Sequence, residues 1–486
     1  MKNLKKVLLL ILVTSLFNRC TDHVDYEAIE GYQITSEIYF QQEADYDAAL
    51  VGTYDVLQWL FFNIQLGAIA SEITLCGGES ATDYIGIQQI DDMTHYPENN
   101  VLRQIWQFLY EGINRANYME ENKANIDFEG KEAMYGEVYF LRAYYYFELV
   151  KFFGDVPLFT EARLTAGQAG TLTRTPKDEV YAQIELDLQN AIASLPNSQS
   201  QVGRVNKYTA YALLGKVLLY QDKFAEAASA LDNVIGVYSL VSDYGSQFLR
   251  FGENGPESVF EIQYSNQSNW YDWGCAHCSE GNYAIIMNGP RGWSGPEYAQ
   301  GWSFNVPTEE FYNSFEEGDS RRDATVLDIE AFAVATGASY TEGYDHTGYF
   351  NNKYIPRAGE SGGQTELNYL TNFRIIRYSD VLLMAAEAYN RGGIDDGLAQ
   401  EFLNQVRRRA FGGDDNDISA SGSALTDAIW EERKFELSLE GHRFFDLVRT
   451  GRASSLIAGF VEGKHEVFPI PQQEVDISGL TQNAGY

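Results

Sequence analysis

A ten-residue stretch, NWYDWGCAHC at residues 269–278, combines two kinds of side chain that can do chemistry. Cys275 and Cys278 form a Cys-x-x-Cys around a histidine, and Trp270 and Trp273 precede them. A Cys-x-x-Cys can be a redox dithiol, part of a zinc site or a local disulfide. An indole ring can instead stack on the apolar face of a sugar. The flanking sequence has to decide between these chemistries.

The flanks of the Cys-x-x-Cys favour a structural role. Redox dithiols act at the start of a helix that follows a strand, whereas these cysteines stand in a segment rich in Gly, Asn and Ser. Zinc would need two more ligands, no second cysteine pair is available, and the six histidines are scattered along the chain. We therefore expect a disulfide that stiffens the loop, with unpaired cysteines and redox or metal chemistry as the alternatives. We expect no cofactor and no bound metal.

The tryptophans carry the stronger functional signal. Four of the seven tryptophans of the chain, Trp270, Trp273, Trp293 and Trp302, lie in one irregular segment outside any helical pattern. Long loops are uncommon unless they have a function. A ring that buries roughly 80 Å² of apolar area contributes about 2 kcal/mol before ordering costs, at roughly 25 cal/mol/Å². Several such rings predict weak, reversible binding of a repeating glycan, although we expect at least one to fill the base of the loop.

The charge of the chain limits its partners. Its 35 Lys and Arg residues against 69 Asp and Glu residues give a net charge of −34. Such a surface repels phosphate backbones, so we expect no nucleic-acid partner. Strongly anionic polysaccharides are disfavoured for the same reason. A neutral ligand fits best.

The N-terminus has the pattern of an export signal. Three lysines precede an apolar run that is too short for a comfortable membrane span, and Cys20 follows it directly. We expect a signal peptide at 1–19 and lipidation of Cys20, although Phe17, Asn18 and Arg19 replace the small residues usual before a lipidated cysteine. A cleaved signal without a lipid and an uncleaved apolar tail are the alternatives. Acyl chains would anchor the protein to a membrane surface.

Most of the remaining chain is predicted to be helical. Apolar and small residues recur at helical spacing over 45–62, 104–122 and 133–159, so Trp59 and Trp106 are expected in the core. Residues 207–235, with Gly215 and Leu231, have the spacing of a tetratricopeptide hairpin, in which a small residue lets two antiparallel helices approach and large ones fill the gap; a weaker copy lies at 378–406. Because the copies are far apart, we interpret them as a scaffold of stacked hairpins rather than as a peptide-binding solenoid. A strand is expected at 258–264.

Several separated stretches together resemble the SusD/RagB family of outer-membrane lipoproteins from Bacteroidetes. These stretches include AALVGTYDVLQ at 48–58, VYFLRAYYYFELVKFFGDVPL at 138–158, GRVNKYTAYALLGKVLLY at 203–220, FRIIRYSDVLLMAAEAYNR at 373–391 and WEERKFELSLEGHRFFDLVRTG at 430–451. The resemblance implies a mainly α fold with a few short strands, in which residues 20–486 form one domain. Tetratricopeptide-like hairpins would support a loop-rich binding insert at about 240–360. It also implies a SusC-like TonB-dependent β-barrel partner.

Members of that family bind glycan through loop residues, partly after the first helices and partly in the central region. The resemblance therefore places the site on the tryptophan segment, with Asn269, Tyr271 and Asp272 beside the rings. The early loop, 77–100, offers Asp83 and Tyr84, and also Gln88 and Tyr96. These positions are carried over by their place in the chain, because the loops of the family vary.

The sequence thus predicts a non-catalytic protein that is anchored to the outer membrane and faces the cell exterior. It would bind a neutral polysaccharide, with a β-glucan such as laminarin as the specific expectation, and deliver it to the barrel. One alternative is a surface glycoside hydrolase, although carboxylate pairs occur by chance in so acidic a chain. Another is a helical scaffold that binds peptides or proteins.

Overall fold

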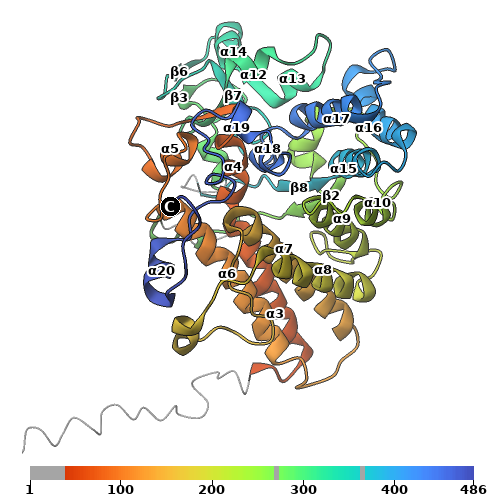
Figure 1. The fold of residues 1–486 in the computed structure, drawn as a ribbon. Helices are drawn as coiled ribbons and strands as arrows, with labels where there is room; N and C mark the ends of the chain where they lie inside the picture. The colour runs from red at the N-terminus through yellow and green to blue at the C-terminus, as the bar shows by residue number, and fades with distance from the viewer. Residues whose placement is uncertain (1–38, 268–272, 362–366) are drawn as a thin grey trace, which may run out of the picture.

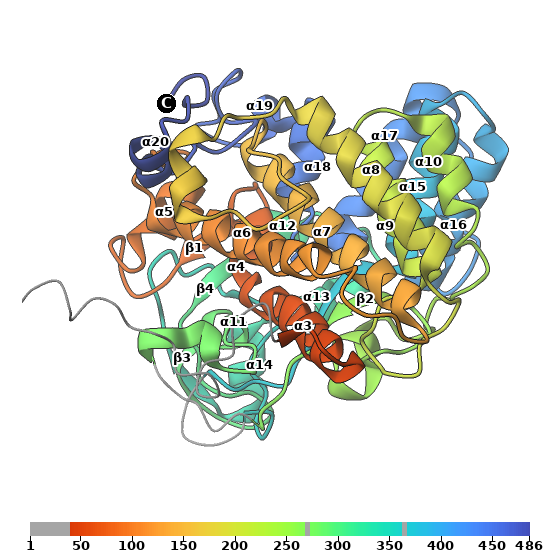
Figure 2. The same ribbon diagram turned by 90° about the horizontal axis from the view of Figure 1, so that it is seen from below.

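The computed structural model describes residues 39–267, 273–361 and 367–486. Most of the longer helices gather on one side of the molecule, and the segment between β2 (Ser258–Ile262) and β7 (Tyr349–Asn351), with its short helices, lies on the other (Figure 1, Figure 2). Seen from below, α11 (Ala284–Met287), β3 (Arg291–Ser294) and α14 (Ile329–Thr336) lie apart from the row of helices that runs from α6 (Asn100–Glu121) to α10 (Phe224–Leu231) (Figure 2). The mainly helical fold expected from the sequence is confirmed.

The longer helices of the first half are α3 (Glu43–Asp55), α4 (Phe61–Ile69), α5 (Ile85–Asp91), α6 (Asn100–Glu121), α7 (Lys131–Phe153), α8 (Lys177–Ser194), α9 (Lys207–Leu219) and α10 (Phe224–Leu231). The second half contains α11 (Ala284–Met287), α12 (Glu309–Asn313), α13 (Arg321–Thr325), α14 (Ile329–Thr336), α15 (Tyr378–Arg391), α16 (Asp396–Phe411), α17 (Gly422–Leu437), α18 (Arg443–Arg449), α19 (Ala453–Leu456) and α20 (Gln472–Ser478). Short 3₁₀ turns are η1 (Val56–Trp59), η2 (Ala166–Thr171), η3 (Tyr244–Phe248), η4 (Arg250–Gly252) and η5 (Trp273–Cys278).

The helices form a continuous packed row. Helix α6 contacts α7, and each of α7, α8 and α9 contacts the next helix; α10 then contacts α15, which packs on α16 and α17. Within the hairpin of α9 and α10, a Cβ at Gly215 would lie 2.5 Å from the side chain of Leu231. The small residue therefore lets the two helices approach, as the spacing predicted. Both expected hairpins are present, the second as α15 and α16.

One predicted helix is broken. The sequence pattern over 45–62 predicts a continuous helix, whereas α3 ends at Asp55 and is followed by η1 and then by α4. Every residue of α4 is buried, while α3 keeps an exposed face. Helix α4 also passes so close to the turn at Gly441 that a Cβ at Gly67 would meet the Gly441 carbonyl at 2.0 Å. The chain leaves the axis of α3 because α4 enters the core.

Within the described residues, eight short strands pair as four antiparallel ribbons. The pairs are β1 (Thr74–Gly77) with β4 (Phe304–Pro307), β2 (Ser258–Ile262) with β8 (Phe373–Arg377), β3 (Arg291–Ser294) with β6 (Ser339–Thr341), and β5 (Val326–Asp328) with β7 (Tyr349–Asn351). The strand expected at 258–264 is therefore β2. Ribbon β1–β4 joins the early loop to the central segment, and ribbon β2–β8 joins that segment to the C-terminal helices.

A buried ionic network fastens the central segment and the end of β8 to α17 and to the turn that follows it. Arg377 donates to Glu436 at 2.8 Å and to Glu440 at 2.7 Å, while Lys353 donates to Glu440 at 2.7 Å and Arg321 to Glu436 at 3.2 Å. All five side chains are nearly inaccessible to solvent. Burial opposes ionisation, yet the surrounding arginines hold the pKa of Glu436 well below its usual value. The network stabilises the position of the loop-rich segment on the helices.

No helix within the described part of the chain is both long enough and apolar enough to cross a bilayer.

Candidate functional site

The structure brings the early loop and the central segment together. The Gly78 amide donates to the Ser303 carbonyl at 2.7 Å, just beyond the last residue pair of ribbon β1–β4. The Tyr344 amide donates to the Gly78 carbonyl at 2.8 Å. Three segments that are far apart in the sequence therefore meet at Gly78. Its left-handed φ of 102° suits glycine, and a Cβ there would lie 2.8 Å from the Phe304 ring.

An ion pair closes the same junction. Arg291 Nη2 donates to Asp83 Oδ2 at 2.8 Å, and Arg291 Nη1 lies 3.5 Å from Glu79 Oε2. Asp83 Oδ2 also accepts from the Glu79 amide at 2.8 Å. Gln88 Nε2 donates to the Gly77 carbonyl at 2.6 Å from the other side of the loop. Asp83 and Gln88 thus shape the early loop, and Arg291 binds it to the central segment.

Tyr84 lies beneath this junction. Its backbone is left-handed, with φ of 49°, where it precedes α5. Its ring lies 5.4 Å from the ring of Phe62 and 6.4 Å from that of Phe304, between centroids. Burial raises the pKa of Tyr84 from its ordinary value of 10.0 to about 12, which further favours the neutral hydroxyl. Tyr84 therefore combines packing with a neutral hydrogen-bonding group.

A layer of aromatic rings on η1 and α4 extends from Tyr84 toward the cysteines. Phe62 contacts Tyr84 on one side and Phe61 on the other, and the Phe61 ring lies 4.0 Å from that of Tyr283. Trp59, two residues before Phe61, has its ring 5.0 Å from His277. One aromatic layer thus supports both the early loop and the cysteine turn.

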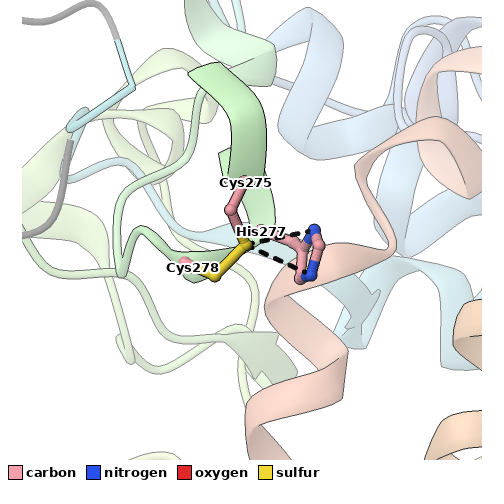
Figure 3. Close-up of side chains that lie close together, drawn as sticks. All are labelled: Cys275, His277 and Cys278. Carbon is pink, nitrogen blue, oxygen red and sulfur yellow. Dashed lines mark hydrogen bonds between the residues drawn. A yellow bond between two sulfur atoms is a disulfide. The ribbon is translucent and has the colours of Figure 1, made fainter. Parts of the chain in front are cut away.

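The predicted disulfide is present. Cys275 and Cys278 are bonded to each other, and the His277 ring lies beside them with Nε2 3.4 Å from Cys275 Sγ (Figure 3). Because the two sulfurs are joined, neither is available as a thiolate for zinc or redox chemistry in this state. Burial lowers the pKa of His277. Cys76 is a buried free thiol.

The base of the loop that bears the tryptophans is also held. The Ser265 amide donates to the Glu280 carbonyl at 2.8 Å, which brings the two ends of the loop together. Gln58 Nε2 donates to the Gln263 carbonyl at 2.9 Å. The His277 ring packs against both Trp59 and Phe108. The base of the loop therefore lies against η1 and α6.

Comparison with known proteins identifies the family of this chain. A family model described as "SusD family" matches residues 256–486, and one described as "Starch-binding associating with outer membrane" matches residues 71–219. A solved laminarin-binding SusD-like protein is 37% identical, with a TM-score of 0.84, and the match covers 92% of this chain and 100% of that one. The chain belongs to the SusD family.

Two further proteins are similar over nearly the whole chain. Surface glycan-binding protein A from Bacteroides thetaiotaomicron, solved in complex with laminarihexaose, is 29% identical with a TM-score of 0.82; the match covers 91% of this chain and 99% of that one. SusD-like protein P2 of Formosa agariphila is 29% identical over 493 residues, covering 93% of this chain and 94% of the relative. The resemblance seen in the sequence is confirmed.

The structure separates the predicted tryptophans of this SusD-family protein. Trp293 is only 9% exposed and packs against Tyr298 and Phe332, with centroids 6.0 and 5.9 Å away. It therefore fills the core beneath β3, as we expected for at least one of the four. Trp302 packs on the main core but remains half-buried, and its backbone adjoins the Ser303–Gly78 contact. A glycan contact by either ring stays a prediction.

Four of the other predicted residues fall outside the part of the chain that the structure describes: Asn269, Trp270, Tyr271 and Asp272. Trp273 begins η5, but its side chain is not among those described. The early-loop candidate Tyr96 is 46% exposed after α5.

Sequence reasoning missed Arg291 and Trp59 as parts of the site. Arg291 is the only lysine or arginine between residues 265 and 307, which was a usable signal for a special role. Trp59 was expected in the core and is buried there, yet its edge supports His277. Its helical spacing gave no sign of that second contact, because the partner is 218 positions away.

Proposed function

We propose that this SusD-family protein binds a neutral polysaccharide without cleaving it, and that the polysaccharide is a β-glucan such as laminarin. The observation that carries the proposal is the 37% identity to a laminarin-binding SusD-like protein over 92% of the chain. The relative solved with laminarihexaose supports the same class of ligand.

The chemistry of the chain agrees with a neutral sugar polymer. A net charge of −34 disfavours anionic glycans. Indole rings on a loop with a fixed base offer apolar faces to sugar rings while leaving the hydroxyls hydrated. A loop held by the disulfide and by the Ser265–Glu280 hydrogen bond loses less entropy on binding. We assign the stacking role to Trp270 and Trp273, with Asn269, Tyr271 and Asp272 beside them.

Calorimetry with three polysaccharides tests the ligand. The mature protein is titrated with laminarin, with the neutral α-glucan amylose and with anionic alginate. We expect binding to laminarin only. Tighter binding to amylose would contradict the β-glucan assignment, and binding to alginate would contradict the charge argument. New reducing ends after incubation with laminarin would show that the protein is a hydrolase.

Two substitutions test the tryptophans. Trp270→Ala and Trp273→Ala should each weaken laminarin binding roughly tenfold, about 1.4 kcal/mol, with little change in thermal stability. Trp106→Phe is the matched control, because Trp106 lies in the core outside the candidate site and phenylalanine keeps a buried ring against Phe153. Unchanged affinity in both alanine variants would remove the aromatic platform from the proposal.

We also propose a cell-surface location and a transport partner. Cys20 would carry the lipid that anchors the protein to the outer membrane, and the bound glycan would pass to a SusC-like TonB-dependent β-barrel. The family model described as "associating with outer membrane" supports this location. Cys20→Ser should shift the protein from the membrane fraction to the soluble fraction. Failure of the wild type to co-purify a β-barrel would contradict the transport role.

A further inference from the structure

A polar pocket of about 270 Å³ lies where the turn before α9 meets strand β2. Helix α9 and β2 contact each other, and both lie on the helical side of the molecule (Figure 1). We call this depression the α9 pocket. Its volume is just below the ~300–1,000 Å³ of sites for drug-sized ligands, so it suits a smaller molecule. Side chains that can both donate and accept hydrogen bonds line it: Gln199, Asn206, Thr209, Tyr238, Asn254 and Ser258.

Two amide side chains of the α9 pocket are held in place within the protein. Asn254 Nδ2 donates to Gln263 Oε1 at 2.9 Å, and Gln263 Nε2 donates back to Asn254 Oδ1 at 3.0 Å. The Asn254 backbone is left-handed, with φ of 52°, and its amide donates to both carboxylate oxygens of the buried Glu261 at 3.1 Å. Gln199 Nε2 donates to the Val205 carbonyl at 2.8 Å. Groups that are fixed in this way lose less entropy when a ligand binds.

The same side chains keep further capacity for hydrogen bonds. The Tyr238 hydroxyl lies 3.5 Å from Asn206 Nδ2, which is longer than the ~2.7–3.2 Å of a normal N–H···O bond. The Gln199 amide uses one N–H on Val205, and an amide has a second N–H and a carbonyl oxygen that accepts. The α9 pocket therefore offers both donors and acceptors to the hydroxyl groups of a ligand.

The charges of the α9 pocket are already paired. Among the described residues that line it, Arg204 and Glu261 are the two charged ones. Arg204 lies 2.8 Å from Asp47 and 3.5 Å from Glu137. Glu261 Oε1 lies 3.7 Å from Arg374 Nε, and both of these side chains are buried. The charged groups of the pocket therefore favour neither an anionic nor a cationic ligand.

The N-terminal end of α9 does not offer an anion site either. Free amides at a helix N-terminus can bind anions. Here Asn206 Oδ1 accepts from the amides of Tyr208 at 2.9 Å and Thr209 at 3.1 Å. The Lys207 amide donates to the Pro196 carbonyl at 2.9 Å. A neutral molecule with several hydroxyl groups matches the α9 pocket best.

We infer that the α9 pocket binds a mono- or disaccharide unit of a neutral glycan, as a sugar site of its own on the helical scaffold. The inference rests on the proposed function, since a neutral polysaccharide supplies such units. It adds a second place on the protein at which sugar hydroxyls are recognised, by hydrogen bonds from amides and hydroxyls.

Photocrosslinking locates the bound sugar. The mature wild-type protein is irradiated with a laminaribiose derivative that carries a diazirine, and mass spectrometry identifies the labelled peptides. Unlabelled laminaribiose competes in one arm and an anionic alginate disaccharide in another. We expect label on residues 198–206 or 254–258, with protection by laminaribiose and none by the alginate disaccharide. Protection by the alginate disaccharide would overturn the assignment of a neutral ligand.

Two double variants test the side chains. Gln199→Leu/Tyr238→Phe keeps the approximate size of both residues and removes their polar groups. Tyr389→Phe/Gln405→Leu is the matched control, because these residues lie on α15 and α16, outside the α9 pocket. Melting temperatures confirm that each protein is folded. Tyr238→Phe alone, which removes a single hydroxyl, is the milder variant.

Labelling of the pocket peptides should fall roughly fivefold or more in Gln199→Leu/Tyr238→Phe and about twofold in Tyr238→Phe, and it should not change in the control. Equal labelling of these peptides in all four proteins would overturn the pocket. Label confined to other parts of a wild type that binds laminarin would also overturn it and leave the proposed function intact. A wild type that binds no neutral glycan would overturn both.

Discussion

Arg291 Nη2 lies 2.8 Å from Asp83 Oδ2, and this contact joins two residues that are 208 positions apart in the sequence. The pair connects the early loop with strand β3, next to the backbone contact between Gly78 and Ser303. Both side chains are partly exposed, so the contact contributes less to stability than to the relative position of the two loops.

We predict that Arg291→Gln and Asp83→Asn each weaken glycan binding several-fold and lower the free energy of unfolding by about 1 kcal/mol or less. The loops would lose their link while the fold remains. A double-mutant cycle on calorimetric affinities measures the coupling, which should reach about 1 kcal/mol. Arg322→Gln, which breaks the exposed pair with Asp323, is the control and should leave affinity unchanged. Additive effects of the two site substitutions would show that the contact does not act as a unit.

A second prediction concerns the disulfide. Cys275→Ser/Cys278→Ser should lower the free energy of unfolding by about 2 kcal/mol or less, because the closed loop is short. The effect on the affinity for laminarin should be larger than the effect on stability, because Trp273 begins the same turn. Treating the wild type with a reductant should reproduce the affinity of the variant, and the variant itself should not respond. Full affinity after confirmed reduction would mean that the disulfide does not organise the site.

The buried ionic network should be costly to break. Arg377→Met removes a cation that Glu436 and Glu440 share, so Glu436 keeps Arg409 and Arg321 and Glu440 keeps Lys353. The free energy of unfolding should fall by about 3 kcal/mol, the lower end of the range for a broken buried pair, because the remaining cations compensate in part. Denaturant unfolding followed by circular dichroism measures the loss. Arg408→Met, at a surface pair with Asp417, should cost less than about 1 kcal/mol. Equal losses of stability in the Arg377→Met and Arg408→Met variants would show that burial does not determine the cost of breaking an ion pair.

The stability of the protein should fall at mildly acidic pH through His95. Burial, with smaller effects of His465 and Lys464, lowers the pKa of His95 to about 3. The unfolded chain binds a proton at this residue near pH 6.5 and the folded chain does not, so stability decreases as pH falls from 6.5 toward 3. At pH 5 the loss from this residue is about 2 kcal/mol.

Unfolding titrations of His95→Gln between pH 7.5 and 4.5 check this effect. Glutamine does not titrate and can keep the hydrogen bond to the Tyr486 hydroxyl, which is 2.7 Å from His95 Nε2. The variant should lose less stability than the wild type over this range. Parallel pH profiles for the two proteins would assign the acid sensitivity to other groups.

Local patterns in the sequence predicted much of the scaffold. The small residue at Gly215 and the large one at Leu231 define a hairpin at short range, and the structure places them in contact. The Cys-x-x-Cys predicted its own disulfide because both partners lie in one turn. The break between α3 and α4 was not predicted, because it depends on packing against Gly441 from the far end of the chain.

The sequence by itself determined the family, the helical hairpins, the acidity and the segment in which aromatic residues gather, since each is a property of composition or of neighbours along the chain. Only the tertiary structure decided that the Trp293 side chain is buried while Trp302 keeps an exposed part. The order of residues in an irregular segment does not show which of its side chains are buried. The tertiary structure also decided that Arg291 holds Asp83 and that the His277 ring of the cysteine turn packs on Trp59. Those relationships arise from contacts between segments that only folding brings together.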